Sequence, residues 1–117
     1  ALDEIEDLVK AGLRKHLHGR IDKLENGLKI TKAERFMSKT ERPDFTAVDK
    51  NGRTVLIECK GTGHAIDCEQ IENYGKRCRA DSPRLMLVAF EFSPRCKKEA
   101  RSRNVELVEC NLGFKWL

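Results

Sequence analysis

Two carboxylates and one amine near the middle of the sequence have the residue types and spacing of a hydrolytic site. Asp44 follows Pro43, and Glu58, Cys59 and Lys60 come after one predicted turn. Two carboxylates held a few ångströms apart repel each other, so a protein that builds such a pair commonly uses it to hold a divalent cation. An amine beside them can orient or activate a water molecule. The group therefore predicts a site that hydrolyses phosphodiesters.

Whether these side chains converge depends on the register of a predicted β-hairpin. Residues 42–49 and 53–60 are rich in β-branched and apolar side chains, which predicts two strands joined at residues 50–52 (Lys-Asn-Gly). A two-residue Asn-Gly turn would send the carboxylate of Asp44 to the face away from Glu58. A three-residue loop, with its glycine in the left-handed conformation, would place the two carboxylates opposite each other. Both loops are chemically allowed.

Within the second strand, the two-residue period puts Glu58 and Lys60 on one face and Cys59 on the other. Charged residues at strand ends beside turns are common, and an isolated Glu-x-Lys is a weak signal. The hydrolytic interpretation therefore also depends on the rest of the chain.

The composition is that of one globular domain, residues 1–117, with a dense ionic surface. Hydrophobic residues make up 39% of the chain and charged residues 36%. The net charge of +4 suits a polyanionic partner such as DNA. No apolar run reaches the length of a membrane span and no signal peptide is evident, so we expect a cytoplasmic protein without membrane contact.

The five cysteines favour neither a zinc site nor an iron–sulfur site. They are scattered without a Cys-x-x-Cys pair, which argues against a zinc ribbon, and their odd number also argues against a complete disulfide framework. We expect them to be reduced thiols.

The order of predicted elements is helix, three strands, helix, strand, helix, strand. The expected helices cover residues 2–17, 66–80 and 95–103, and the expected strands cover residues 28–33, 42–49, 53–60, 84–90 and 105–109. Residues 61–63 (Gly-Thr-Gly) are expected to break the strand pattern. Early strands joined by hairpins and later strands joined by helices predict an α/β fold with a mixed sheet covered on both faces.

Two predicted helices carry further candidates for the site. Glu6 falls on the edge of the apolar stripe of the first helix, where it could face the site or lie at the solvent margin. Gln70 and Tyr74 are four residues apart and share one face of the second helix. Candidates for contacts with nucleic acid are Arg42, His64, Lys76 and Arg77.

Taken together, these residues resemble the PD-(D/E)xK nuclease superfamily, which has a restriction-endonuclease-like fold with an αβββαβ core. The likeness is greatest to the RecB-like nuclease domain of the NucS/EndoMS family of DNA endonucleases. That domain carries a run similar to residues 24–29, an Asp-x-x-Gly turn as in residues 49–52, a Glu-x-Lys strand and a Gln-x-x-x-Tyr helix. Its last helix and strand are similar to residues 100–109. The sequence has no counterpart of the family's separate N-terminal DNA-binding domain.

The resemblance implies a role for each site residue. Asp44 and Glu58 would bind Mg²⁺, or Mn²⁺ in its place, with help from the main-chain carbonyl of Cys59. Lys60 would position the attacking water. Glu6 would complete the acidic site, and Gln70 with Tyr74 would support it.

The expected function is therefore metal-dependent hydrolysis of DNA, by an endonuclease that acts on structured or single-stranded DNA in repair or recombination. Two alternatives on the same fold are a Holliday-junction resolvase and a module that binds nucleic acid without cutting it. A resolvase would be a homodimer, an arrangement that the sequence leaves open.

Overall fold

The computed structural model describes residues 11–13, 15, 17, 21–33, 42–110 and 114–117, and the structural statements below refer to these residues. They form a six-stranded sheet whose spatial order follows the chain, from β1 to β6. The strands are β1 (Lys29–Ala33), β2 (Phe45–Val48), β3 (Thr54–Gly63), β4 (Arg84–Phe92), β5 (Val105–Cys110) and β6 (Phe114–Trp116). The helices with complete bounds are α2 (Ile21–Leu24), α3 (Ala65–Arg77) and α4 (Pro94–Arg103).

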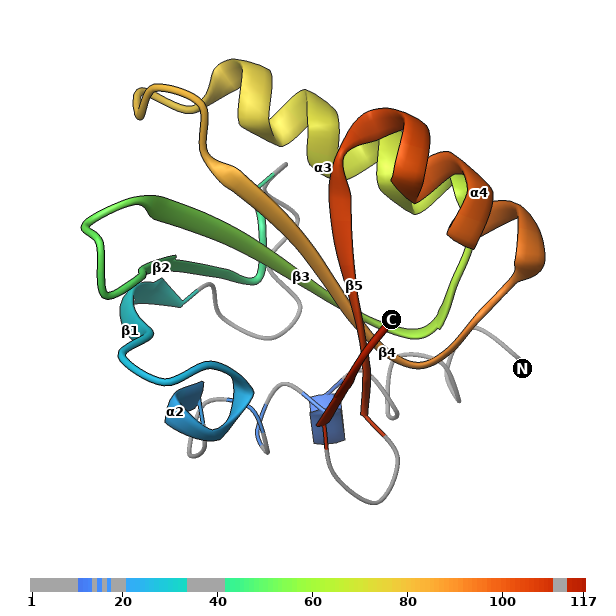
Figure 1. Ribbon diagram of the computed structural model, residues 1–117, viewed down its shortest axis with the longest axis horizontal. Helices are drawn as coiled ribbons and strands as arrows, with labels where there is room; N and C mark the ends of the chain where they lie inside the picture. The colour runs from blue at the N-terminus through green and yellow to red at the C-terminus, as the bar shows by residue number, and fades with distance from the viewer. Residues whose placement is uncertain (1–10, 14, 16, 18–20, 34–41, 111–113) are drawn as a thin grey trace.

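The sheet is mixed, as the order of elements predicted. Strands β1, β2 and β3 are antiparallel neighbours, β3, β4 and β5 are parallel, and β6 returns antiparallel to β5. The parallel strands need long crossovers, which α3 and α4 provide. Figure 1 shows these two helices side by side on one face of the sheet, with α2 on the opposite side.

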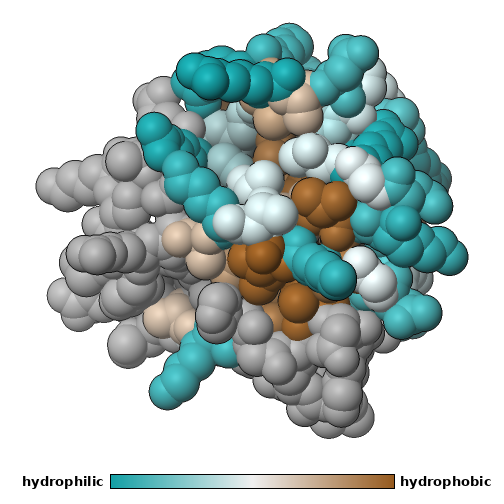
Figure 2. Space-filling view, turned by 90° about the vertical axis from the view of Figure 1, so that its left-hand side faces the viewer, coloured by the Kyte–Doolittle hydropathy of each residue, from teal (hydrophilic) through white to brown (hydrophobic). Residues whose placement is uncertain are grey.

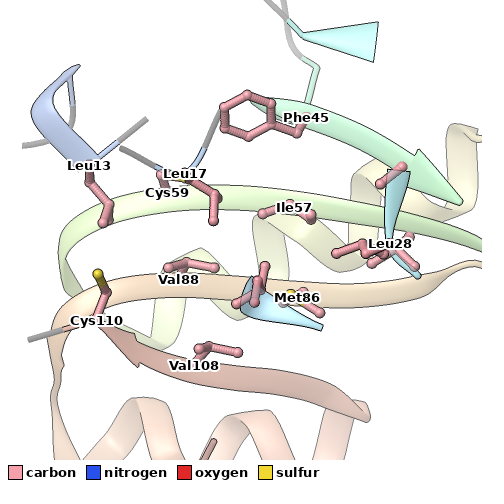
Figure 3. Packing of buried hydrophobic residues seen from close by; sticks show 13 residues of the cluster. Leu13, Leu17, Leu28, Phe45, Ile57, Cys59, Met86, Val88, Val108 and Cys110 are labelled. Atoms are coloured by element: carbon pink, nitrogen blue, oxygen red, sulfur yellow. The ribbon is translucent and has the colours of Figure 1, made fainter. Parts of the chain in front are cut away.

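Each face of the sheet buries its own hydrophobic cluster, because side chains alternate between the faces along every strand. In the first cluster, Leu13 and Leu17 pack against the strands (Figure 3). The strands contribute Phe45, Ala47, Val55, Ile57, Cys59, Met86, Val88, Val108 and Cys110 to it. The second cluster joins the sheet to α3 and α4 and contains Leu56, Leu87 and Ala89 from the strands. Glu58 and Lys60 share the strand face of Leu56, so the candidate site lies on the side of α3.

Helix α4 begins where the sequence predicted a helix. Its N-cap is Ser93, whose hydroxyl oxygen accepts a hydrogen bond from the Cys96 N–H at 3.1 Å, and Pro94 occupies the first turn. The helix ends at Asn104 in the left-handed conformation, with φ of 59°.

The structure corrects several predicted boundaries. Strand β3 does not end at Lys60 but continues to Gly63, because Thr62 and Gly63 pair with Glu91 and Phe92 of β4. The Gly-Thr-Gly run therefore extends the strand instead of breaking it. A side chain at Gly63 would collide with the ring of Phe92.

Other differences arise where the sequence signal is short. Helix α3 ends at Arg77 instead of residue 80, and β2 begins at Phe45 instead of residue 42. The short elements α2 and β6 were not predicted at all. All five cysteines are free thiols, and the sulfur atoms of Cys68 and Cys96 lie 3.6 Å apart between α3 and α4.

An ionic cluster closes the end of the sheet opposite the candidate site. The Arg84 guanidinium forms two hydrogen bonds with Glu25, each of 2.7 Å, and two with Glu106, of 2.9 and 2.7 Å. It also donates to Asp49 at 3.2 Å. These contacts tie β4 and β5 to the turn after α2 and to the β2–β3 hairpin.

The surface agrees with the highly charged composition. In Figure 2, hydrophilic side chains cover much of the described surface, and they border a patch of hydrophobic ones above it and to its right. None of the helices in the described part of the chain is both long enough and apolar enough to cross a membrane.

Candidate active site

The β2–β3 hairpin has the three-residue loop that places the two carboxylates opposite each other. The Asp49 N–H donates to the Arg53 carbonyl at 2.9 Å, and the Gly52 N–H donates to the Asp49 carbonyl at 3.0 Å. Gly52 has φ of +82°, in the left-handed region that favours glycine. The Asp49 carboxylate fixes this loop, because its Oδ1 accepts hydrogen bonds from the N–H groups of Asn51 and Arg53, both of 2.9 Å.

This register brings Asp44 to Glu58. Phe45, the first residue of β2, pairs with Ile57, so Asp44, which immediately precedes β2, lies opposite Glu58 on β3. The Asp44 N–H donates to Glu58 Oε1 at 3.1 Å. Asp44 Oδ2 in turn accepts the N–H of Cys59 at 2.8 Å. The main chain thus holds each carboxyl group in place beside the other.

The carboxyl group of Glu58 is strongly perturbed in this position. The Glu58 residue is only 6% exposed, and this burial raises the pKa of its carboxyl group to about 9. That value also includes the effects of a hydrogen bond to the Asp44 carboxyl group and of the charge of that group, which act in the same direction, whereas the charge of Lys60 and the hydrogen bond from the Asp44 N–H act against the rise. Without a cation, one proton between the two groups therefore relieves their repulsion.

The chemistry of this pair fits a hard divalent cation. Carboxylate oxygens are the ligands that Mg²⁺ prefers, and Mg²⁺ commonly binds to one or two carboxylates and completes its shell with water and substrate phosphate. Among the residues that the structure describes, no third His, Cys, Asp or Glu side chain joins the pair to form a metal-binding group. Two carboxylates therefore fit the coordination that Mg²⁺ accepts.

Lys60 lies beside the pair on the same strand and face. Its side chain is 13% exposed, and its Nζ lies 3.5 Å from Oδ1 of Asp67, whose side chain is 10% exposed. Asp67 was not a predicted site residue. It is in the first turn of α3, where its other oxygen accepts the N–H of His64 at 2.8 Å. The sequence could have indicated Asp67 as a helix-capping residue, because it lies three residues after the N-cap, where acidic side chains commonly accept a main-chain N–H.

A hollow of about 700 Å³ opens between Lys60 and α3. Gln70 and Tyr74 both line it, so the predicted shared face of this helix does lie at the lysine. Burial raises the pKa of the Tyr74 hydroxyl, and the nearby charge of Glu58 raises it further. Lys76 and Arg77 line the same hollow, and the Arg77 guanidinium lies 5.5 Å from the centre of the Tyr74 ring.

A second hollow, of about 340 Å³, shares Tyr74 and Arg77 with the first. Its other lining residues include Arg42, Lys32 and Pro43, so three cationic side chains surround it. Of the four predicted nucleic-acid contacts, Arg42, Lys76 and Arg77 therefore line the two hollows. His64 is exposed immediately before α3.

Two further predicted site residues are Glu6 and Cys59. Glu6 lies outside the described residues, and its role stays a prediction. The side chain of Cys59 is buried in the first hydrophobic cluster, on the face away from Glu58, as the strand period predicted. Participation of its main-chain carbonyl in metal binding stays a prediction.

The buried carboxyl pair predicts a pH-dependent gain in stability for Glu58→Gln. The unfolded chain ionises Glu58 near the ordinary glutamate pKa of 4.5, whereas the folded chain ionises it only near a pKa of about 9, so ionisation disfavours folding as the pH rises between these values. Glutamine keeps the oxygen that accepts the Asp44 N–H but cannot ionise. In a chelator, we expect the variant to gain about 1–3 kcal/mol at about pH 8 and little at about pH 5. Urea unfolding at the two pH values measures this difference, and an equal effect at both would contradict it.

Comparisons with known proteins show which proteins the chain resembles in sequence and in fold. No family model matches the sequence. The chain is 31% identical over 108 residues to an Endonuclease NucS from Arthrobacter sp. (strain FB24), and the match covers 89% of this chain and 46% of that protein. The chain therefore spans about half the length of this relative.

Solved structures show the same fold. A repair endonuclease from Pyrococcus abyssi matches with a TM-score of 0.74 and 22% identity over 86% of this chain and 46% of that one. EndoMS in its apo form matches with a TM-score of 0.69 and 17% identity, covering 86% of this chain and 44% of that one. EndoMS in a complex with double-stranded DNA matches with a TM-score of 0.71 and 20% identity, covering 83% of this chain and 42% of that one. The chain has a NucS/EndoMS-like nuclease fold, as the resemblance implied.

Proposed function

We propose that this chain is the nuclease domain of a DNA endonuclease that acts in repair, and that it hydrolyses phosphodiester bonds with the help of a divalent cation. The observation that carries the proposal is the contact between Asp44 and Glu58, with Lys60 on the same face of β3. The similarity to Endonuclease NucS and to structures of EndoMS and a repair endonuclease supports it.

Asp44 and Glu58 would hold Mg²⁺, for which Mn²⁺ could substitute. When bound, the cation would polarise the scissile phosphate and stabilise the charge that develops on the leaving oxygen. The two carboxylates would serve this role because a bound cation offsets both the burial and the negative charge of Asp44, which together raise the pKa of Glu58. The main-chain hydrogen bonds to Glu58 Oε1 and Asp44 Oδ2 orient them before the substrate arrives.

Lys60 would hold the attacking water against the phosphate. An ammonium group offers three donors and a fixed positive charge, so it can orient a water molecule and favour the approach of an anionic substrate. Gln70 and Tyr74 line the hollow beside it and would supply neutral hydrogen-bonding groups to the same region.

The cationic side chains around the two hollows would bind the DNA backbone. Arg42, Lys76 and Arg77 lie on either side of Tyr74, on the helix and loop that border the carboxyl pair. Each phosphate that they neutralise releases counterions, so binding should weaken steeply as the salt concentration rises.

Cleavage of a panel of DNA substrates tests the proposal. Single-stranded, splayed, mismatched and four-way DNA would each be incubated with the protein in Mg²⁺, in Mn²⁺ and in a chelator. We expect cleavage of at least one substrate in either metal and none in the chelator. Salt-sensitive DNA binding without cleavage in either metal would contradict the proposal and favour a binding module that does not cut.

A further inference from the structure

We propose that Asp67 is a positioning residue, which holds the ammonium group of Lys60 in place for hydrolysis. This inference rests on the proposed function of Lys60. The two side chains form an ion pair of 3.5 Å, and both are largely shielded from solvent. Ion pairs of exposed side chains contribute little, but a pair that is almost wholly covered is less screened by salt and water.

The carboxylate of Asp67 has a fixed place, because α3 holds it from two directions. Its Oδ2 accepts the N–H of His64 at 2.8 Å, and its own N–H donates to the His64 carbonyl at 3.0 Å. One oxygen thus caps the helix, and the other is directed to Lys60. A residue anchored in this way can locate a longer and more flexible side chain.

The charges around Lys60 explain why its ammonium group needs an anionic partner to stay in place. The lysine lies near the first turn of α3, where the unpaired N–H groups and the helix dipole are positive and disfavour a cation. Asp67 offsets this repulsion. The charge of Glu58 also acts on Lys60, but that carboxylate would be committed to a divalent cation during catalysis. Asp67 would still offer the lysine a negative charge at that stage.

Asp67→Asn separates positioning from helix capping. Asparagine keeps an oxygen that can accept the His64 N–H, so the cap and the fold are retained, but it removes the charge that faces Lys60. We expect kcat for DNA cleavage to fall about 10- to 100-fold with little change in KM, because a small displacement of a catalytic group has an effect of this size. Glu69→Gln is the matched control, since Glu69 is exposed, lines the same hollow and belongs to the same helix.

A spectroscopic measurement keeps this inference separate from the proposed function. In wild-type protein labelled with ¹⁵N, the ammonium group of Lys60 should give a sharp ¹H–¹⁵N signal that Lys60→Met abolishes, because the ion pair slows its exchange with water. Asp67→Asn should broaden or remove the signal, and Glu69→Gln should preserve it. If wild-type protein cleaves no DNA, the proposed function fails, but the spectra still test the contact. An unchanged Lys60 signal in Asp67→Asn, or wild-type kcat in an active preparation, would overturn the inference.

Discussion

Asp44→Asn should cleave DNA about 1,000-fold more slowly than the wild-type chain, at saturating Mg²⁺. Removing one group that stabilises transition-state charge costs about 10²–10³ in rate, and loss of a metal ligand also weakens the hold on the cation. The substitution is nearly isosteric. The amide oxygen of the asparagine can accept the N–H of Cys59, which in the wild-type chain lies 2.8 Å from Oδ2 of Asp44, so we expect the hairpin to keep its register.

The rate of cleavage under single-turnover conditions measures this effect, and thermal unfolding checks the fold. Asp81→Asn is the matched control, because Asp81 is an exposed aspartate in the connection between α3 and β4. It removes the same charge from the protein and should leave the rate unchanged. Cleavage by Asp44→Asn at the wild-type rate in Mg²⁺ or Mn²⁺ would contradict the assigned site.

Arg84→Met should lower the free energy of unfolding by about 2–4 kcal/mol without touching the candidate site. Removing one partner from a fully buried ion pair costs about 3–5 kcal/mol, since the remaining charges stay uncompensated. Here the Arg84 side chain is 15% exposed, but those of Glu25 and Glu106 are 27% and 34% exposed. Because water screens these partly exposed carboxylates, the expected loss of stability is smaller than for a fully buried pair. Methionine keeps the length of the apolar stem, so the loss reports the charge and its hydrogen bonds.

Arg53→Met is the matched control at the same end of the sheet. Arg53 is exposed, and its guanidinium donates a hydrogen bond to the Ser82 carbonyl at 2.9 Å, so we expect a loss below about 1 kcal/mol. Urea unfolding gives both values. Equal losses in the free energy of unfolding for Arg84→Met and Arg53→Met would contradict the stabilising role of the ionic cluster around Arg84.

The same cluster explains part of the resemblance from which the family was inferred. The run at residues 24–29 places Glu25 against Arg84, buries Leu24 and Leu28 in the first hydrophobic cluster, and turns at Gly27 with φ of +82°. Asp49 serves both the hairpin loop and the arginine. These segments are far from the paired carboxylates, so this part of the motif reflects the architecture that holds the strands together.

The sequence could predict much of the fold because its strongest signals are local. The alternation in β3 assigned Glu58 and Lys60 to one face, and Ser93-Pro94 marked the start of α4. The loop between β2 and β3 could not be decided, since Asn-Gly suits either turn. The Asp49 carboxylate, which accepts two main-chain N–H groups, favours the three-residue loop.

Other features depend on contacts between elements that no local pattern in the sequence encodes. The continuation of β3 through Gly63 arises from pairing with β4, and no local property of two glycines predicts it. Asp67 resembles any acidic residue in a first helical turn until the crossover brings it to Lys60. The partners of Arg84 likewise come from three separate segments.

Diffraction from crystals of the wild-type chain soaked in Mn²⁺ tests the central claim most directly. The anomalous signal of the ion locates it independently of any activity assay. We predict a peak in contact with the carboxylates of both Asp44 and Glu58, and no peak there in crystals of Asp44→Asn. A fully occupied Mn²⁺ elsewhere, with the two carboxyl groups still hydrogen-bonded to each other and without metal, would contradict the account.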